Sequence, residues 1–115
     1  MKTFLKVMKA LSDPSRVRTM KLLEERSLCV CELQDLLGLA QSTVSKHMKT
    51  LEEAGLVDSE RRGTWIIYHR GTGDRSDYAA NILKQLPVWL NDDRDLRTMR
   101  ENLPRAAKIR VNCPK

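Results

Sequence analysis

The sequence predicts a mainly α fold with one small β-hairpin, an α+β domain built around residues 27–55. Two observations lead to this prediction. Two short amphipathic segments follow one another across a tight turn, and two β-rich runs joined by three residues come directly after them. Because 115 residues are enough for one small core, we expect a single domain over residues 1–103.

The opening residues predict an amphipathic helix. Its apolar residues recur at helical spacing and are Phe4, Leu5, Met8 and Leu11. This stripe is expected to pack either on the core of the domain or on a second subunit.

A second helix is predicted to begin at Asp13-Pro14. Asp13 or Ser12 is a suitable cap, and proline is tolerated in the first turn, where its missing N–H does no harm. The buried face is expected to hold Val17, Met20 and Leu23. The basic residues are expected on a solvated face, with phosphate contact as the alternative, and are Arg16, Arg18 and Lys21.

Residues 30–55 predict two short helices on a tight turn, which is a helix-turn-helix. The first ends at Gly38, a turn spans residues 39–42, and the second closes at Ala54-Gly55. The apolar stripe of the first helix is Leu33, Leu36 and Leu37, and that of the second is Val44, Met48 and Leu51.

The outward face of the second helix has the composition of a DNA recognition helix. In this motif the second helix lies in the major groove of double-stranded DNA. Its outward residues all have side chains that can form hydrogen bonds, and acids appear only in the last turn at Glu52 and Glu53. An ordinary solvated face is the alternative, but it would mix both charge signs throughout. The candidate DNA-binding residues are Gln41, Ser42, Thr43, Ser45, Lys46 and Lys49.

The β-rich runs 56–60 and 64–69 predict a hairpin whose connection is Arg61-Arg62-Gly63. A hairpin directly after a recognition helix forms a wing. Arg61 and Arg62 are therefore expected to contact phosphates or the minor groove, rather than to be only a solvated basic turn.

After a break at residues 71–73, the sequence predicts a long apolar helix that Pro87 interrupts. Its stripe is Tyr78, Ile82, Leu83, Leu86 and Leu90. Residues 92–103 predict a short polar helix. The basic segment 104–115, with Arg105, Lys108 and Arg110, is expected to be a mobile tail.

Composition restricts the function classes. The net charge of +6 suits an anionic partner, but it is not concentrated on the helix-turn-helix. No apolar run approaches the roughly 18 residues of a membrane span, so we expect no membrane partner and a cytoplasmic protein. Three cysteines, an odd number, favour free thiols over a disulfide framework.

These residues resemble the arsenical-resistance repressor family, the ArsR/SmtB type of winged-helix regulators. The resemblance rests on Ala10 to Arg16, Leu28 to Leu33 and Gln41 to Met48, and it extends through residues 51–57 and the Arg-Gly wing. It implies a homodimeric cytoplasmic repressor that releases operator DNA when it binds a metal or metalloid. Members pair through their first and last helices, so the segment 78–90 is the expected dimer interface, with Trp89 as a candidate anchor.

The resemblance also implies that Cys29 and Cys31 bind the inducer, trivalent arsenic or antimony, with no cofactor required. On a regular helix a Cys-Val-Cys spacing places the side chains about 200° apart, so both cysteines reach one ion only if the first turn unwinds. A position at the helix start is expected to lower the thiol pKa and favour the thiolate. The alternative is that both are small buried hydrophobes.

A third thiolate is not assured, because Gln34 stands where the family's best-known arrangement has a cysteine. Cys113 is the candidate third ligand, from the same or the partner subunit. The alternatives are a chance cysteine in the tail and a two-thiolate site completed by water or another small ligand.

Other sensors and classes are less consistent with the sequence. The histidines, His47 and His69, do not form the zinc or nickel site of the last helix. Cadmium, lead and a redox thiol switch stay open. A thiol arsenate reductase or phosphatase with a phosphate-binding loop has an arginine six residues after its cysteine, where this chain has Asp35 and Leu37, and no other catalytic constellation is present, so we expect no enzyme. An effector-free architectural DNA binder is the remaining class.

Overall fold

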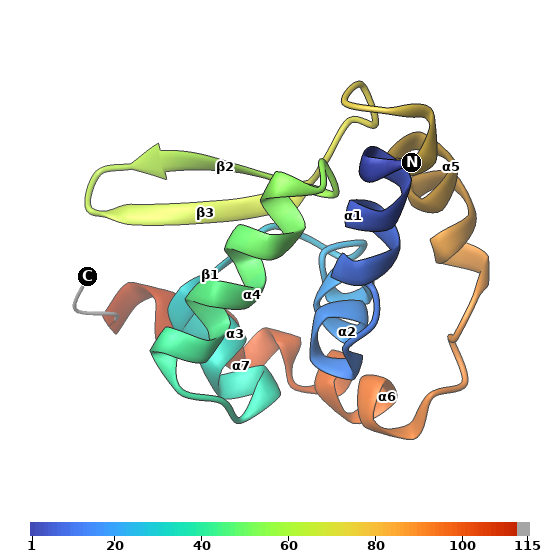
Figure 1. Cartoon of the computed structure of the whole chain (residues 1–115). Helices are drawn as coiled ribbons and strands as arrows, with labels where there is room; N and C mark the ends of the chain where they lie inside the picture. The colour runs from blue at the N-terminus through green and yellow to red at the C-terminus, as the bar shows by residue number, and fades with distance from the viewer. Residues whose placement is uncertain (113–115) are drawn as a thin grey trace.

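The computed structural model describes residues 1–112, with side chains through residue 110 (Figure 1). The elements are α1 (Lys2–Ala10), α2 (Pro14–Leu22), β1 (Leu28–Cys29), α3 (Val30–Leu37), α4 (Gln41–Glu53), β2 (Val57–Arg62), β3 (Trp65–Arg70), α5 (Asp77–Gln85), the 3-10 helix η1 (Leu86–Val88), α6 (Arg94–Glu101) and α7 (Leu103–Asn112). The prediction of a mainly α winged helix-turn-helix is confirmed.

Helix α1 buries only part of its predicted apolar stripe. Val7 and Ala10 face the core and are fully buried, whereas Phe4 and Leu5 keep 39% and 52% of their surface exposed. The apolar side chains at the start of α1 therefore do not serve the core of this subunit.

Helix α2 begins as predicted, because the Asp13 carboxylate accepts the backbone N–H of Ser15 at 2.8 Å and Pro14 opens the helix. The expected solvated basic face is wrong for Lys21, which is fully buried. Its Nζ donates to the carbonyl of Leu86 at 2.7 Å and lies 3.1 Å from Glu24, so the buried ammonium is hydrogen-bonded and paired.

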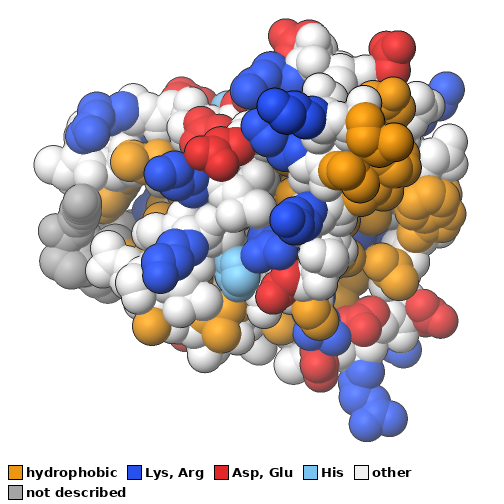
Figure 2. Space-filling view, viewed as in Figure 1, with side chains coloured by type: hydrophobic (Ala, Val, Ile, Leu, Met, Phe, Trp, Pro, Cys, Tyr) orange, Lys and Arg blue, Asp and Glu red, His pale blue; other side chains and the backbone are white. Residues whose placement is uncertain are grey.

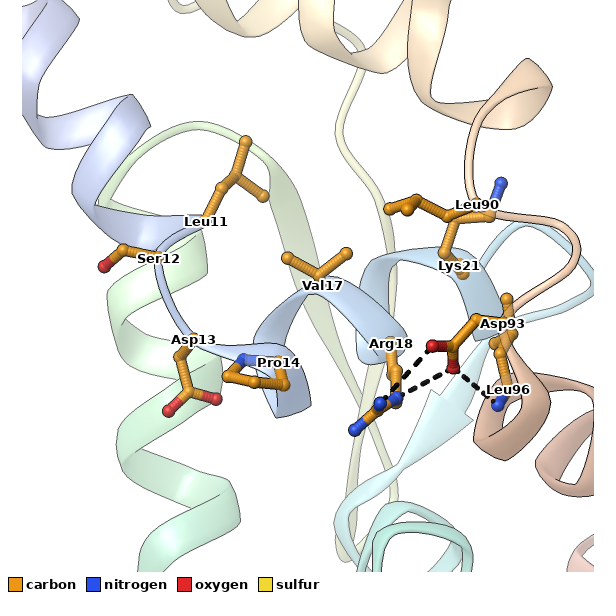
Figure 3. A pocket seen from close by; sticks show the side chains of 10 residues that line it. All are labelled: Leu11, Ser12, Asp13, Pro14, Val17, Arg18, Lys21, Leu90, Asp93 and Leu96. Carbon is orange, nitrogen blue, oxygen red and sulfur yellow. Dashed lines mark hydrogen bonds and ion pairs between the residues drawn. The ribbon is translucent and has the colours of Figure 1, made fainter.

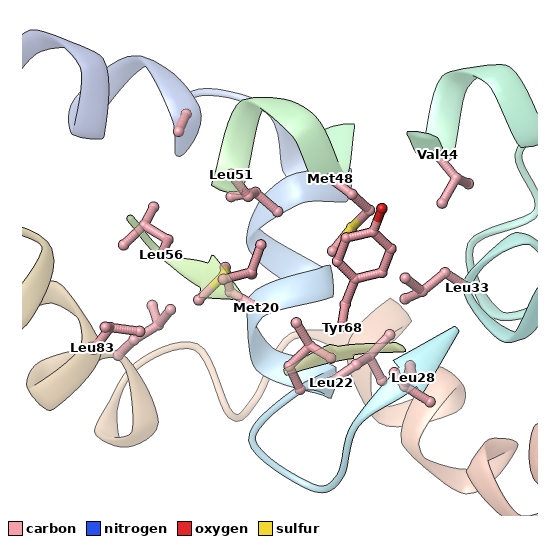
Figure 4. Packing of buried hydrophobic residues seen from close by; sticks show 14 of the residues in the cluster. Met20, Leu22, Leu28, Leu33, Val44, Met48, Leu51, Leu56, Tyr68 and Leu83 are labelled. Carbon is pink, nitrogen blue, oxygen red and sulfur yellow. The ribbon is translucent and has the colours of Figure 1, made fainter. Parts of the chain in front are cut away.

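The helix-turn-helix is built as its apolar spacing predicts. Gly38 ends α3 in the left-handed conformation at φ 70°, which glycine adopts without a Cβ clash. Figure 4 shows the buried side chains that converge from α2, α3, α4, α5, the sheet and the residue before β2. They include Met20, Leu22, Leu28, Leu33, Val44, Met48, Leu51, Leu56, Tyr68 and Leu83.

The antiparallel sheet has the order β1-β3-β2, so β2 is an outer edge and β3 is central. The hairpin register pairs Arg62 with Trp65, which places the turn at residues 63–64. Arg61 and Arg62 therefore lie at the end of β2 and not in the turn. The sequence did not predict β1, in which Cys29 pairs with Ile67 of β3.

Helix α5 ends at Gln85 and Pro87 lies in the 3-10 helix η1 that follows, in agreement with the predicted interruption. Leu90 follows in a left-handed conformation at φ 64°, and Val88, Trp89 and Leu90 are all exposed. Helix α6 then returns along α2.

Residues 104–112 form helix α7, where the sequence predicted a mobile tail. Leu103 and Ala106 are buried and α7 packs on α3 (Figure 1). The helix is basic, as expected, but two of its arginines pair with acids of α3, namely Arg105 with Asp35 and Arg110 with Glu32. Cys113 lies outside the described residues.

Candidate nucleic-acid interface and thiol site

The predicted recognition residues lie on the outer side of α4. Gln41, Ser42, Ser45, Lys46 and Lys49 are exposed and Thr43 is half-buried. The opposite side of α4 is fixed in the core by Val44, Met48 and Leu51. Basic side chains are spread over the face that carries α4, with acids between them, as Figure 2 shows.

The first turn of α4 is uncapped. Its N-cap residue is Ala40, whose side chain has no acceptor, and the turn contains no acidic residue. The N–H groups at this end and the positive end of the helix dipole are thus available to an anion such as a DNA phosphate.

The wing is joined to the end of α4 by a hydrogen bond from Ser59 Oγ to Glu52 at 2.8 Å. Arg61 and Arg62 are exposed on β2, and Arg62 lies 3.2 Å from the carboxylate of Glu60. Because that ion pair is exposed, it contributes little to stability and is a weak competitor for a phosphate.

Cys29 and Cys31 lie at the start of α3, but only Cys31 is in the helix. Cys29 is the N-cap, in extended conformation, and is a free thiol that is 2% exposed. It forms a capping box with Glu32, in which the Cys29 N–H donates to Glu32 Oε1 at 2.8 Å. Cys31 is half-buried in the first turn and is disulfide-bonded, so the expectation of free thiols is wrong for Cys31 and holds for Cys29.

Glu32 links the start of α3 to two arginines and to the Cys29 backbone, although the sequence did not predict a role for it. The carboxylate is fully buried and accepts from Arg26 at 2.8 Å and from Arg110 at 2.9 Å. The available signal was the Cys-x-x-Glu spacing of residues 29–32, which matches a capping box with cysteine in place of serine.

The acid-base properties of this cluster differ from the prediction. Burial raises the pKa of the Cys29 thiol, and the negative charge of Glu32 adds to that effect. The expected lowering by the helix start is outweighed, so the reduced thiol is protonated at neutral pH. Burial also acts to raise the pKa of Glu32, but hydrogen bonds from Cys29, Arg26 and Arg110 lower it overall.

The described residues contain no preformed metal site and one cavity apart from the thiols. Within residues 1–112, no three His, Cys, Asp or Glu side chains come together as a metal site. A cavity of about 370 Å³ lies between α2 and the segment before α6, with the Arg18–Asp93 ion pair at one side (Figure 3). No cysteine lines it, so it is separate from the thiols.

Among the described helices, none has the length and apolar character to cross a membrane.

Comparison with known proteins identifies relatives along most of the chain. Residues 13–59 match the family described as bacterial regulatory protein, arsR family. The chain is 30% identical over 102 residues to the arsenical resistance operon repressor of Escherichia coli K12, covering 88% of this chain and 85% of that protein. It is 43% identical over 63 residues to the arsenic resistance regulator ArsR1 of Pseudomonas putida, covering 54% of this chain and 49% of that one.

Solved structures share the fold. A homodimeric winged helix-turn-helix domain from Mycobacterium bovis superposes with a TM-score of 0.64 at 22% identity, covering 81% of this chain and 82% of that one. An ArsR-like regulator from Rhodococcus sp. RHA1 gives 0.58 at 25% identity, covering 97% and 93%. The relatives are transcriptional regulators and not enzymes, as the sequence predicted. The chain belongs to the ArsR family of transcriptional regulators.

Proposed function

We propose that this protein is a dimeric repressor that binds operator DNA through α4 and the wing and is released by trivalent arsenic or antimony at Cys29 and Cys31. The relatives named for arsenical resistance support the inducer class. The observation that carries the proposal is the position of Cys29. It caps α3 and also pairs with Ile67 in the central strand of the wing.

Coordination by Cys29 requires changes at both of these elements. Cys31 is disulfide-bonded, so its disulfide must first be reduced. The buried thiol of Cys29 must then lose its proton and its sulfur must turn toward Cys31, which breaks the capping box with Glu32. The first turn of α3 then loses its cap, and α3 supports α4 through their packed apolar faces. A ligand that binds this altered state more tightly shifts the protein away from the DNA-binding state.

An exposed apolar surface supports the dimer. Phe4 of α1 lies beside Tyr78 of α5, with the two rings 5.3 Å apart in an edge-to-face contact. Phe4, Tyr78 and the neighbouring Leu5 of α1 are all exposed. Figure 2 shows apolar side chains gathered on the side of the molecule that holds α1 and α5. A second copy of the chain would bury this surface, and the Mycobacterium bovis neighbour is homodimeric.

The decisive experiment is release from a fluorescent fragment of the protein's own promoter, measured under reducing conditions. Arsenite, antimonite, cadmium and zinc are titrated against wild type, the Cys29→Ser/Cys31→Ser pair and Cys113→Ser. Arsenite is expected to release wild type but not the pair. Cys113→Ser decides whether the tail supplies a third thiolate.

Release by arsenite from the Cys29→Ser/Cys31→Ser pair would reject these ligands. Release only by cadmium would assign another soft metal, and release only by oxidant would assign a redox switch. If nothing releases the wild type, the protein is a DNA binder without an effector.

A further inference from the structure

A polar cluster joins three helices at the corner of α1, α2 and α4. Arg16 Nε donates to the carbonyl of Ala10 at 2.7 Å, and its Nη2 donates to the carbonyl of Lys9 at 3.3 Å. The third nitrogen, Nη1, lies 3.1 Å from Nδ1 of His47 on α4. Nε2 of the same ring lies 3.8 Å from the Asp13 carboxylate, which caps α2.

The hydrogen-bonding chemistry fixes the state of the ring. A guanidinium only donates, so Nδ1 of His47 must accept from Arg16 and is unprotonated. The neutral imidazole then carries its proton on Nε2, on the side of Asp13. All three nitrogens of Arg16 are engaged inside the protein, which leaves it poorly placed to bind a phosphate.

We propose that Arg16 and His47 are positioning residues that hold α4 against α1 and α2 in the orientation that binds DNA. We call the contacts of Arg16 with His47, Lys9 and Ala10 the clasp. The apolar face of α4 is fixed in the core by Val44, Met48 and Leu51, and His47 adds a polar contact to α2 outside that face. His47 follows the exposed Lys46 directly, so the clasp sets where that lysine and Ser45 point. The inference rests on the proposed DNA interface at α4, and it does not depend on the inducer.

The clasp also ties α4 to the helix that carries the exposed Phe4 and Leu5. Arg16 donates to two carbonyls in the last turn of α1, those of Lys9 and Ala10, and the Lys9 carbonyl also accepts from the N–H and hydroxyl of Ser12. One guanidinium therefore links the proposed dimer surface to the proposed DNA surface.

The test compares Arg16→Lys, His47→Leu and their double variant by DNA affinity over a range of salt concentrations. Lysine keeps the charge of Arg16 but cannot bridge α1 and His47 together. We expect each single variant to lose affinity by about tenfold with the salt slope of wild type, because no phosphate contact is removed. The double variant is expected to be no weaker than the singles, since both break one clasp.

Two matched controls accompany these variants. Arg18→Lys lies on the same helix but pairs with Asp93 and Asp95, so its DNA affinity is expected to stay at the wild-type value. His47→Asn places an acceptor close to the position of Nδ1, so it is expected to recover most of the loss seen with leucine. Because His47→Leu and His47→Asn differ only at position 47, comparing their DNA affinities tests the clasp even if Arg16→Lys does not fold.

Hydrogen exchange of the α4 amides gives a readout without DNA. It is expected to quicken in His47→Leu and to return toward wild type in His47→Asn, while the amides of β3 stay unchanged. Wild-type affinity in both single variants, or a shallower salt slope in either, would overturn the clasp. If wild type itself does not bind DNA, the proposed function is overturned. If hydrogen exchange of the α4 amides is unchanged in His47→Leu, the clasp is overturned whatever the DNA affinities are.

Discussion

The two helices of the motif begin in opposite ways. The start of α3 is closed, with a buried cysteine as its cap and a buried glutamate that two arginines hold. The start of α4, only 11 residues later, has an alanine cap and exposed Gln41 and Ser42. The first turn of each helix has backbone N–H groups without an acceptor in the helix. In α3 the capping box of Cys29 and Glu32 pairs N–H groups at this end with side chains of the protein, whereas no side chain caps the first turn of α4.

The difference separates two tasks. An end that is closed by its own side chains changes only when a ligand competes with them, which suits an inducer site. An end without a cap meets an anion at no structural cost, which suits a DNA phosphate. The predictions below test each end in turn.

The largest effect is expected from Glu32→Ala. This change leaves Arg26 and Arg110 without their buried partner and removes half of the capping box, so the free energy of unfolding should fall by about 3 kcal/mol. Urea denaturation at fixed protein concentration measures it. The control is Asp35→Ala, which breaks the more exposed pair with Arg105 and should cost less than about 1 kcal/mol. Equal losses would show that the closed end is not specially stabilised.

Acid is expected to weaken the same end. The pKa of Glu32 is lowered from its ordinary 4.5, so its contribution is complete above that value and is lost as the pH falls through the lowered pKa. The stability of wild type should therefore drop more steeply below pH 4.5 than that of Glu32→Gln. Urea midpoints measured down the pH scale give both curves, and parallel curves would contradict the assignment.

Capping the open end should raise stability and weaken DNA binding together. Ala40→Asp supplies a carboxylate to the first turn of α4 and should stabilise the protein by about 1 kcal/mol. The same charge repels phosphate, so affinity for the promoter fragment should fall. Ala40→Ser is the matched variant, because it caps without charge and should keep more of the affinity. If both variants bind as wild type does, the first turn of α4 does not meet the backbone of DNA.

The smallest effect is expected from Lys46→Ala, which removes one exposed cation from α4. Affinity should fall modestly at every sequence, and the slope of log affinity against log salt should decrease by about 1. Fluorescence anisotropy at four or more salt concentrations measures the slope. An unchanged slope would place Lys46 away from phosphate.

Local patterns explain what the sequence predicted well. The three-and-four spacing of Leu33, Leu36, Val44 and Met48 and the glycine at position 38 define both helices of the motif, because these signals act within one or two turns. The outward residues of α4 follow from the same spacing. The DNA contacts of these residues and the inducer contacts of Cys29, Cys31 and Cys113 stay predictions.

Long-range pairing explains what the sequence did not predict. The burial of Lys21 depends on the carbonyl of Leu86, and the order of α7 depends on Arg110 meeting Glu32, 78 residues away in the chain. The raised pKa of Cys29 follows first from its burial, and Cys29 lies in β1, a strand of two residues that pairs with the distant β3. No spacing within a short window encodes such partners.

The outer edge of the wing has a consequence for solubility. Strand β2 leaves one row of backbone amides and carbonyls unpaired, and such an edge is a template for the strands of other molecules. Five consecutive polar residues, Asp58 to Arg62, cover it, and four of them are charged. The wing can therefore project from the body of the protein to reach a nucleic acid without recruiting further copies into a growing sheet.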